Sequence, residues 1–187
     1  MFKQTLKIAL YLSLTISLSV FTTSCKKESI DNEDENELIT TIKLNFTAGG
    51  TTQSFSYSDP DGDGGKAPTI ATINLKANTT YTMTIEILDE SKTPVSKITD
   101  EVAAEKDEHL FIYTPSPANL FTYTYGDKDS RNLNVGLTGN VKTGAIASGK
   151  MKVQLRHQPP INGKATKDGT VTPGSDDVNV DFNVTIQ

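Results

Sequence analysis

Apolar and polar side chains alternate along most of the chain between Ile39 and its last residues. The final run is the clearest, because every second residue from Val178 to Ile186 is apolar and the residues between them are polar or charged. A period of two places alternate side chains on opposite faces of a β-strand. With one apolar and one polar face, the pattern is typical of antiparallel sheets that bury a single face.

The same alternation recurs in seven earlier runs, and a further short strand is expected near Leu110–Tyr113. The runs are Ile42–Phe46, Phe55–Tyr57, Ala71–Leu75, Tyr81–Ile87, Phe121–Tyr125, Leu133–Leu137 and Met151–Leu155. Their content of Thr, Val, Ile and Tyr agrees with strand propensity. About nine strands predict an all-β fold, an antiparallel two-sheet sandwich of the immunoglobulin-like type over residues 38–187.

Two segments depart from the period of two. Residues 98–108 form either a short helix, with Ile98 and Val102 on one side, or a charged connection at the edge of a sheet. Residues 159–176 precede the last strand and contain three pairs of turn-forming residues, Asn162-Gly163, Asp168-Gly169 and Pro173-Gly174. Such pairs predict a long loop or an irregular hairpin.

The first residues have the pattern of a secretory signal. Lys3 and Lys7 precede an apolar run of 13 residues, Ile8 to Val20, whereas a membrane-spanning helix needs roughly 20. Small residues and then Cys25, the only cysteine in the chain, follow this run.

The boundary at Cys25 resembles the lipobox of bacterial lipoproteins, although Thr22 stands where leucine is more usual. The resemblance implies that residues 1–24 are a lipoprotein signal peptide and that Cys25 is acylated with chains such as palmitate. Two acyl chains anchor a protein stably to a membrane. The other interpretation is an ordinary signal peptide with an incidental cysteine.

Residues 25–37 are strongly acidic. Two lysines and six carboxylates give the segment a net charge of −4, and its only apolar residue is Ile30. A segment that buries so little is expected to be a disordered tether. It resembles the acidic cluster that follows the acylated cysteine in Bacteroidota-type lipoproteins displayed on the outer surface. That resemblance implies a lipid-anchored outer-membrane protein at the cell surface, with the periplasmic face as the alternative.

Three stretches of the body resemble small Bacteroidota-type lipoproteins of uncharacterised function. They are the acidic, glycine-rich segment Asp59–Gly65, the sequence Asp107-Glu108-His109 before a strand, and the sequence Leu155-Arg156-His157-Gln158-Pro159. Members of that group are sometimes labelled type 1 periplasmic-binding-fold proteins or GTP cyclohydrolases. Neither label follows from these residues.

The residues available for catalysis are few. Cyclohydrolases of that kind hold a catalytic zinc ion with cysteines, and the single cysteine here is assigned to the anchor. The two histidines, His109 and His157, are 48 positions apart, and a zinc site would need both of them together with carboxylates. We expect each histidine to lie at the surface or at a strand end instead.

Other ligand classes find little support in the sequence. The stretch Gly144–Met151 is one residue short of a phosphate-binding loop, and the residues after Lys150 alternate as a strand rather than a helix. The chain carries a net charge of −5 and no basic patch with interleaved aromatics, which argues against nucleic acid. Tyr123 and Tyr125 share the inward parity of Phe121, which favours core packing over a sugar platform.

The stretch Asp59–Gly65 is the strongest candidate for a metal site in the sequence. Asp59, Asp61 and Asp63 alternate as in the opening of a calcium loop, but Ile70 stands where a bidentate glutamate would close an EF-hand. Two interpretations stay open: a strand-borne calcium site, or a polar turn between two strands.

Together these features predict a membrane-anchored lipoprotein with a non-catalytic binding or structural module at the cell envelope. Its ligand is an unidentified protein or glycan, and no cofactor other than calcium is suggested. The alternative is an envelope hydrolase whose site is built from loop carboxylates.

Overall fold

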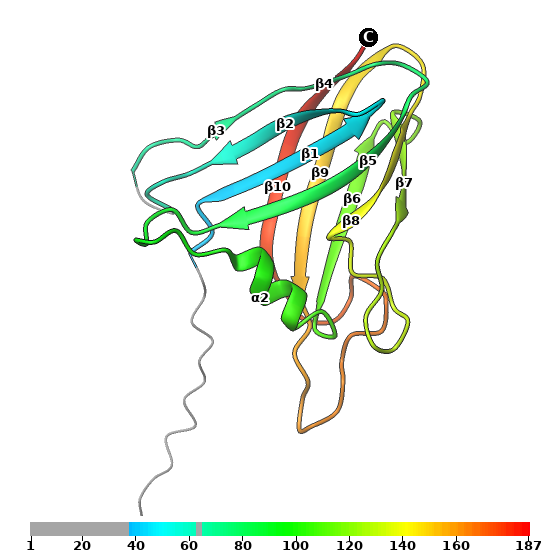
Figure 1. Ribbon diagram of the computed structural model, residues 1–187. Coiled ribbons are helices and arrows are strands. Elements are labelled where there is room, and N and C mark those ends of the chain that lie inside the picture. Colours follow the sequence, from blue (N-terminus) through cyan, green and yellow to red (C-terminus); the bar gives the residue numbers. More distant parts are fainter. Residues whose placement is uncertain (1–37, 63–64) are drawn as a thin grey trace, which may run out of the picture. The chain divides into compact units, whose positions relative to one another are not determined.

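Two β-sheets face each other in the computed structural model, which describes residues 38–62 and 65–187 (Figure 1). One sheet has six strands in the order β3-β2-β1-β5-β8-β7, and the other has four in the order β4-β10-β9-β6. The strands are β1 (Thr41–Ala48), β2 (Thr51–Ser58), β3 (Thr69–Ile70), β4 (Ile73–Leu75), β5 (Thr80–Leu88), β6 (His109–Ser116), β7 (Phe121–Tyr125), β8 (Thr138–Thr143), β9 (Ala147–His157) and β10 (Ser175–Ile186).

The all-β, two-sheet sandwich predicted from the alternation is therefore confirmed. The strand pairs are antiparallel except for β4 and β10, which run parallel over three residues. The run predicted at Ala71–Leu75 is divided, because β3 pairs with β2 in one sheet and β4 pairs with β10 in the other. The chain thus crosses between the sheets at this point.

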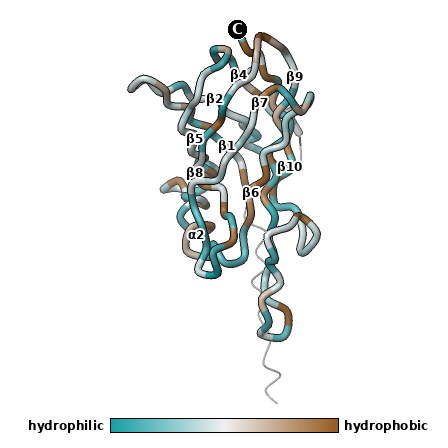
Figure 2. Tube along the Cα trace, turned by 90° about the vertical axis from the view of Figure 1, so that its right-hand side faces the viewer, coloured by the Kyte–Doolittle hydropathy of each residue, from teal (hydrophilic) through white to brown (hydrophobic). Residues whose placement is uncertain are grey.

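The core lies between the sheets and is made by the apolar faces that the alternation predicts. Figure 2 shows hydrophobic and hydrophilic residues following one another along the strands. The large sheet contributes side chains such as Leu44, Phe46 and Met83, and the small sheet contributes Val153 and Phe182, all of them fully buried. Burying a side chain of this size contributes about 1.5–3 kcal/mol.

The helix α2 (Ile98–Ala104) resolves the ambiguity of residues 98–108. Ile98 and Val102 lie one turn apart and are both buried in the core. Thr99 fixes the helix to the edge of β5, because its hydroxyl accepts a hydrogen bond from Ile87 N (2.7 Å) and donates one to Ile87 O (3.1 Å). That edge needs a partner, since β8 pairs with β5 only as far as Thr84.

One predicted strand is wrong: residues 133–137 are irregular, and the strand lies at Thr138–Thr143 instead. The carboxylate of Asp127 accepts hydrogen bonds from the backbone N–H groups of Gly136 and Leu137, at 2.7 and 2.8 Å. The segment also connects the two sheets, because Val135 O accepts from Phe111 N and Leu137 O accepts from Ile85 N. Local alternation does not reveal such a crossing.

The connection from β9 to β10 is a long loop, as the turn signals predict, and it projects beyond the sheets in Figure 1. Gly174 ends this loop with a φ of 76° and lies against the carbonyl of His157. A Cβ atom at Gly174 would collide with that carbonyl, and the positive φ disfavours other residues as well. Glycine therefore allows β10 to start directly beside the end of β9.

Phe182 provides a test of the core. Replacing Phe182 with Ala should lower the free energy of unfolding by about 3–5 kcal/mol, because a large buried ring is lost and a cavity remains. Urea unfolding followed by circular dichroism measures the change. Asp181→Asn on the same strand is the control and should stay within about 0.5 kcal/mol of the wild type. A loss below about 1 kcal/mol for Phe182→Ala would contradict the packing described.

Candidate functional site

His109 and His157 lie side by side at one end of the four-stranded sheet. His109 is the first residue of β6 and His157 is the last residue of β9, and the two are direct partners in the antiparallel register. Their rings are stacked, with centroids 4.7 Å apart and an interplanar angle of 7°. Residues that are far apart in sequence are thus brought together by strand pairing alone.

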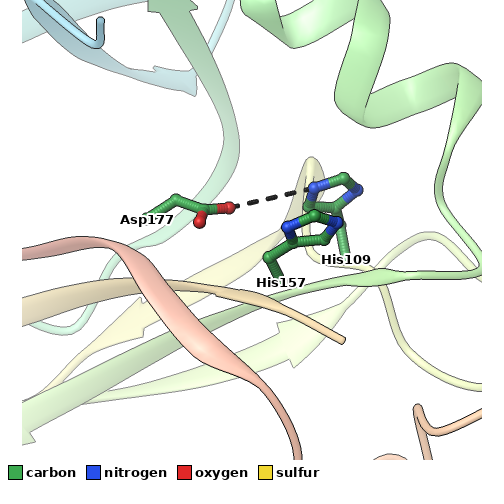
Figure 3. A group of neighbouring side chains, drawn as sticks. All are labelled: His109, His157 and Asp177. Carbon is green, nitrogen blue, oxygen red and sulfur yellow. Dashed lines mark ion pairs between the residues drawn. The ribbon is translucent and has the colours of Figure 1, made fainter. Parts of the chain in front are cut away.

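Asp177 is placed next to this pair by a β-bulge in β10. The register shifts between Asp176 and Val178, which leaves Asp177 as the extra residue. Asp176 pairs with Arg156 through an ion pair of 2.7 Å on the outer face, whereas the carboxylate of Asp177 points toward the two imidazoles (Figure 3). Bulges commonly redirect a side chain in this way.

The orientation of His109 is fixed by the turn that precedes it. His109 Nδ1 is 3.1 Å from the backbone carbonyl oxygen of Glu105. A carbonyl only accepts hydrogen bonds, so Nδ1 carries the proton and Nε2 is left as the atom with an available lone pair. His109 Nε2 lies 3.9 Å from Asp177 Oδ2, and His157 Nε2 lies 3.8 Å from Glu108 Oε2.

Both histidines lie at strand ends, as the expectation of a surface or strand-end position allows, and His109 is buried there. Burial lowers the pKa of His109 to about 4, and the nearby charges of His157 and Lys167 act in the same direction. The hydrogen bond to Glu105 opposes this shift. His109 is therefore neutral at physiological pH.

The turn Glu105–Glu108, between α2 and β6, has a partner for each of its four carbonyl oxygens. His109 Nδ1 donates to Glu105, and the buried ammonium of Lys167 donates to Lys106 at 2.8 Å. Arg131 donates to Asp107 at 2.8 Å, and the backbone of Gln158 donates to Glu108 at 2.7 Å. These contacts connect the turn with β9 and with two distant loops.

A buried ion pair holds the same region together. Lys167 Nζ lies 3.1 Å from Asp129 Oδ2, and both side chains are fully buried. Burial by itself raises the pKa of Asp129, but hydrogen bonds from Leu133 N, Lys167 and Arg131 N bring it below its usual value. Burial lowers the pKa of Lys167, and the contact with Asp129 opposes that shift. Each charge is therefore compensated by the other.

The histidine end of the sheet offers the donor atoms of a transition-metal site. Ligand atoms of His109, His157 and Asp177 all lie within 4.8 Å of one another. Within residues 38–62 and 65–187, no other group of three His, Cys, Asp or Glu side chains meets this criterion. Imidazole nitrogen and carboxylate oxygen are ligands that zinc accepts.

The acidic segment is described only in part, because Asp63 lies outside the described residues. Asp59 Oδ2 accepts a hydrogen bond from the Tyr57 hydroxyl (3.1 Å), while its Oδ1 is buried without a hydrogen-bond partner in the described part of the chain. Asp61 Oδ2 accepts from Lys66 N at 3.0 Å, which closes the turn. The calcium site at Asp59, Asp61 and Asp63 therefore stays a prediction.

Asp59 and Asp177 line the same cavity of about 280 Å³. The cavity lies beside β10, with Leu38, Ile39 and Val178 among its other lining residues. Asp177 is the lining residue that also belongs to the histidine group.

The tyrosines of β7 pack inward, as their parity predicts. The ring centroids of Tyr123 and Tyr113 are 4.4 Å apart, and burial raises the pKa of both hydroxyl groups. The hydroxyl of Tyr125 donates to Phe111 O at 2.8 Å. Residues Ala147 onward form β9, so the stretch resembling a phosphate-binding loop continues as a strand, as expected.

Asp177 is the site residue that the sequence did not indicate. Two consecutive aspartates stand where the alternation of the last strand begins, and a doubled polar position of this kind is a signal for a bulge. Cys25, by contrast, was singled out from the sequence and lies outside the described residues.

The contribution of the buried ion pair to the free energy of unfolding can be tested. Lys167→Met should lower the free energy of unfolding by about 3 kcal/mol, because the buried carboxylate of Asp129 loses its nearest cation and keeps only Arg131, whose Nη2 lies 3.7 Å away. The double variant Asp129→Asn with Lys167→Met should recover part of the loss, since no uncompensated charge remains. Chemical denaturation measures both values. Equal losses in the single and double variants would contradict this account.

Comparison with known protein families, curated proteins and solved structures finds no match for this chain. The resemblance to small Bacteroidota-type lipoproteins therefore stays a prediction from the sequence.

Proposed function

We propose that this chain is a lipoprotein of the cell envelope, anchored through acylated Cys25, whose β-sandwich is a non-catalytic binding or structural module. The observation that carries the proposal is the position of the only cysteine, which is separated by four residues from the apolar run of a signal sequence and precedes an acidic segment. A lone thiol in an exported protein has no partner for an intramolecular disulfide, and acylation gives it a role.

The organisation of the body supports the same proposal. Regular strands begin at Thr41, shortly after the acidic segment, and continue to Ile186. None of the helices in the described residues is long and apolar enough to cross a membrane. In this proposal the lipid supplies the attachment to the outer membrane, and residues 25–37 separate the module from the lipid surface. The net negative charge of that segment is the reason for assigning it the role of a tether. We place the module at the cell surface, with the periplasmic face as the alternative.

An envelope hydrolase remains the second candidate, and one observation favours it. Two carboxylates, those of Asp59 and Asp177, line the cavity beside β10, and pairs of carboxylates carry out acid–base hydrolysis in many enzymes. We rank this function second because the carboxylate of Asp177 is directed toward His109 (Figure 3).

The anchor is tested by metabolic labelling. Cells that express the full chain and are fed radiolabelled palmitate should incorporate label into the wild type and not into Cys25→Ala, because acylation requires the thiol. Autoradiography of the immunoprecipitated protein measures the incorporation. Label retained on Cys25→Ala, or a wild type recovered entirely in the soluble fraction, would remove the lipoprotein proposal.

The calcium interpretation of the acidic segment is tested by thermal unfolding of the metal-free chain. Calcium should raise the melting temperature, since three crowded carboxylates repel one another unless a cation lies between them. A ligand at a hundredfold excess over its dissociation constant stabilises the folded state by about 2.7 kcal/mol. Magnesium should act more weakly because it tolerates irregular oxygen cages poorly.

The variant Asp61→Asn should reduce the effect of calcium, and Asp181→Asn is the control with the same change of charge. A melting temperature that does not respond to calcium would leave the segment as a polar turn.

A further inference from the structure

We propose that His109, His157 and Asp177 bind one divalent transition-metal ion of the zinc type, with Glu108 as the fourth ligand. The proposal goes beyond the lipoprotein function and does not depend on it, because none of the four residues belongs to the anchor or the tether. It rests on contacts at the end of the small sheet (Figure 3).

The spacing of the donor atoms is close to what a tetrahedral ion requires. Ligands at 2.0–2.2 Å from zinc lie about 3.4 Å from one another. His109 Nε2 and Asp177 Oδ2 are 3.9 Å apart, and His157 Nε2 and Glu108 Oε2 are 3.8 Å apart. To bind one ion the imidazole rings must rotate, because in the stacked arrangement, 7° from parallel, their ring nitrogens do not point at a common position.

The surroundings of His109 are those of a metal-binding imidazole. Such histidines almost always donate their other ring N–H to a carbonyl or carboxylate, which fixes the tautomer and directs the free nitrogen to the ion. In this structure the carbonyl of Glu105 has that role at 3.1 Å. The remaining nitrogen, Nε2, faces the carboxylate of Asp177. Both atoms carry lone pairs of the kind that ligate a zinc-type cation.

Each ligand is held on a rigid element. His109 and His157 are register partners at one end of the small sheet, where β9 pairs with the edge strand β6 on one side and with β10 on the other. The bulge directs the side chain of Asp177 toward the histidines. The preceding residue, Asp176, forms an ion pair with Arg156 on the opposite face of the sheet. Metal sites bind tightly when their ligands are positioned in advance by the fold.

Glu108 lies outside the group of three whose donor atoms fall within 4.8 Å of one another, and its side chain would have to rotate from the turn before β6 to reach the ion. Its carbonyl accepts a hydrogen bond from Gln158 N at 2.7 Å, which fixes its backbone opposite the end of β9. Its carboxylate is partly buried beside His157. With both carboxylates bound, a divalent ion is electrically neutralised, and four protein ligands make a closed site of the structural type. Such a site agrees with a non-catalytic module.

The donor set also selects the class of metal. Two nitrogens and two carboxylates suit zinc and its neighbours, which accept imidazole and four-coordinate geometry. Calcium prefers six to eight oxygen ligands, and magnesium prefers octahedral oxygen coordination. The histidine site is therefore distinct in chemistry from the predicted calcium site at the acidic segment.

The test uses the full-length chain without a histidine tag, purified in detergent and freed of metal. All samples carry Cys25→Ser, so that no thiol competes for the ion. Zinc is titrated against a chromophoric chelator. The wild-type site should bind one zinc ion per chain, and Asp177→Asn should weaken binding at least about tenfold, the smallest loss seen when even an outer-shell partner is removed. Asp181→Asn, on the same strand but facing outward, should bind as the wild type does.

Two further measurements keep the result interpretable. Zinc should raise the melting temperature of the wild type and of Asp181→Asn but not of Asp177→Asn, and circular dichroism shows whether the variants keep the fold. Cobalt bound to the wild type should give the strong visible absorption of a four-coordinate site, a readout that needs no variant.

Different results would contradict the metal site, the assignment of Glu108 and the lipoprotein proposal. Absence of zinc binding by the wild type, or equal binding by Asp177→Asn, overturns the site. A weak, octahedral cobalt spectrum, or unchanged affinity in Glu108→Gln, overturns the assignment of Glu108 as fourth ligand. Neither result bears on acylation of Cys25, and loss of palmitate labelling would leave zinc binding unaffected.

Discussion

Burial of one face of each sheet against the other is the constraint on which the rest of the structure depends. Each strand contributes every second side chain to a shared core that contains residues such as Phe46, Met83 and Phe182. The layers stay together because this apolar area is removed from water. At the ends of the sandwich the same arrangement exposes backbone groups between the layers, and these need hydrogen-bond partners.

At the end of the sandwich that carries α2, polar side chains from distant parts of the chain supply these hydrogen bonds. Lys167 and Arg131 donate to carbonyls of the turn Glu105–Glu108, and the charge of Lys167 is balanced by Asp129. Because Lys167 is fully buried and contacts both Asp129 and the carbonyl of Lys106, any other position of its loop would leave the ammonium without these partners. The loop between β9 and β10 is held through Lys167, which leaves the histidine pair in a defined environment.

The candidate metal site depends on these contacts around the turn Glu105–Glu108. The turn holds the Nδ1 atom of His109, strand pairing stacks the two imidazoles, and the bulge brings Asp177. The bulge interrupts a regular register and brings a carboxylate to two imidazoles. Folded proteins retain local irregularities of this kind where a side chain must point in a particular direction.

The sequence by itself determined the strands and the class of fold, because a period of two is a local property that depends only on which face of a strand is buried. It also determined the position of Cys25 and the inward parity of Tyr123. Alternation failed at residues 133–137, where the carboxylate of Asp127 captures two backbone N–H groups and turns the segment between the sheets. Only the tertiary structure decided the histidine site. His109 and His157 are 48 residues apart, and Asp177 joins them through a shift of one residue in the register. Register depends on which strands become neighbours, and that is set by packing across the whole domain rather than by any local pattern.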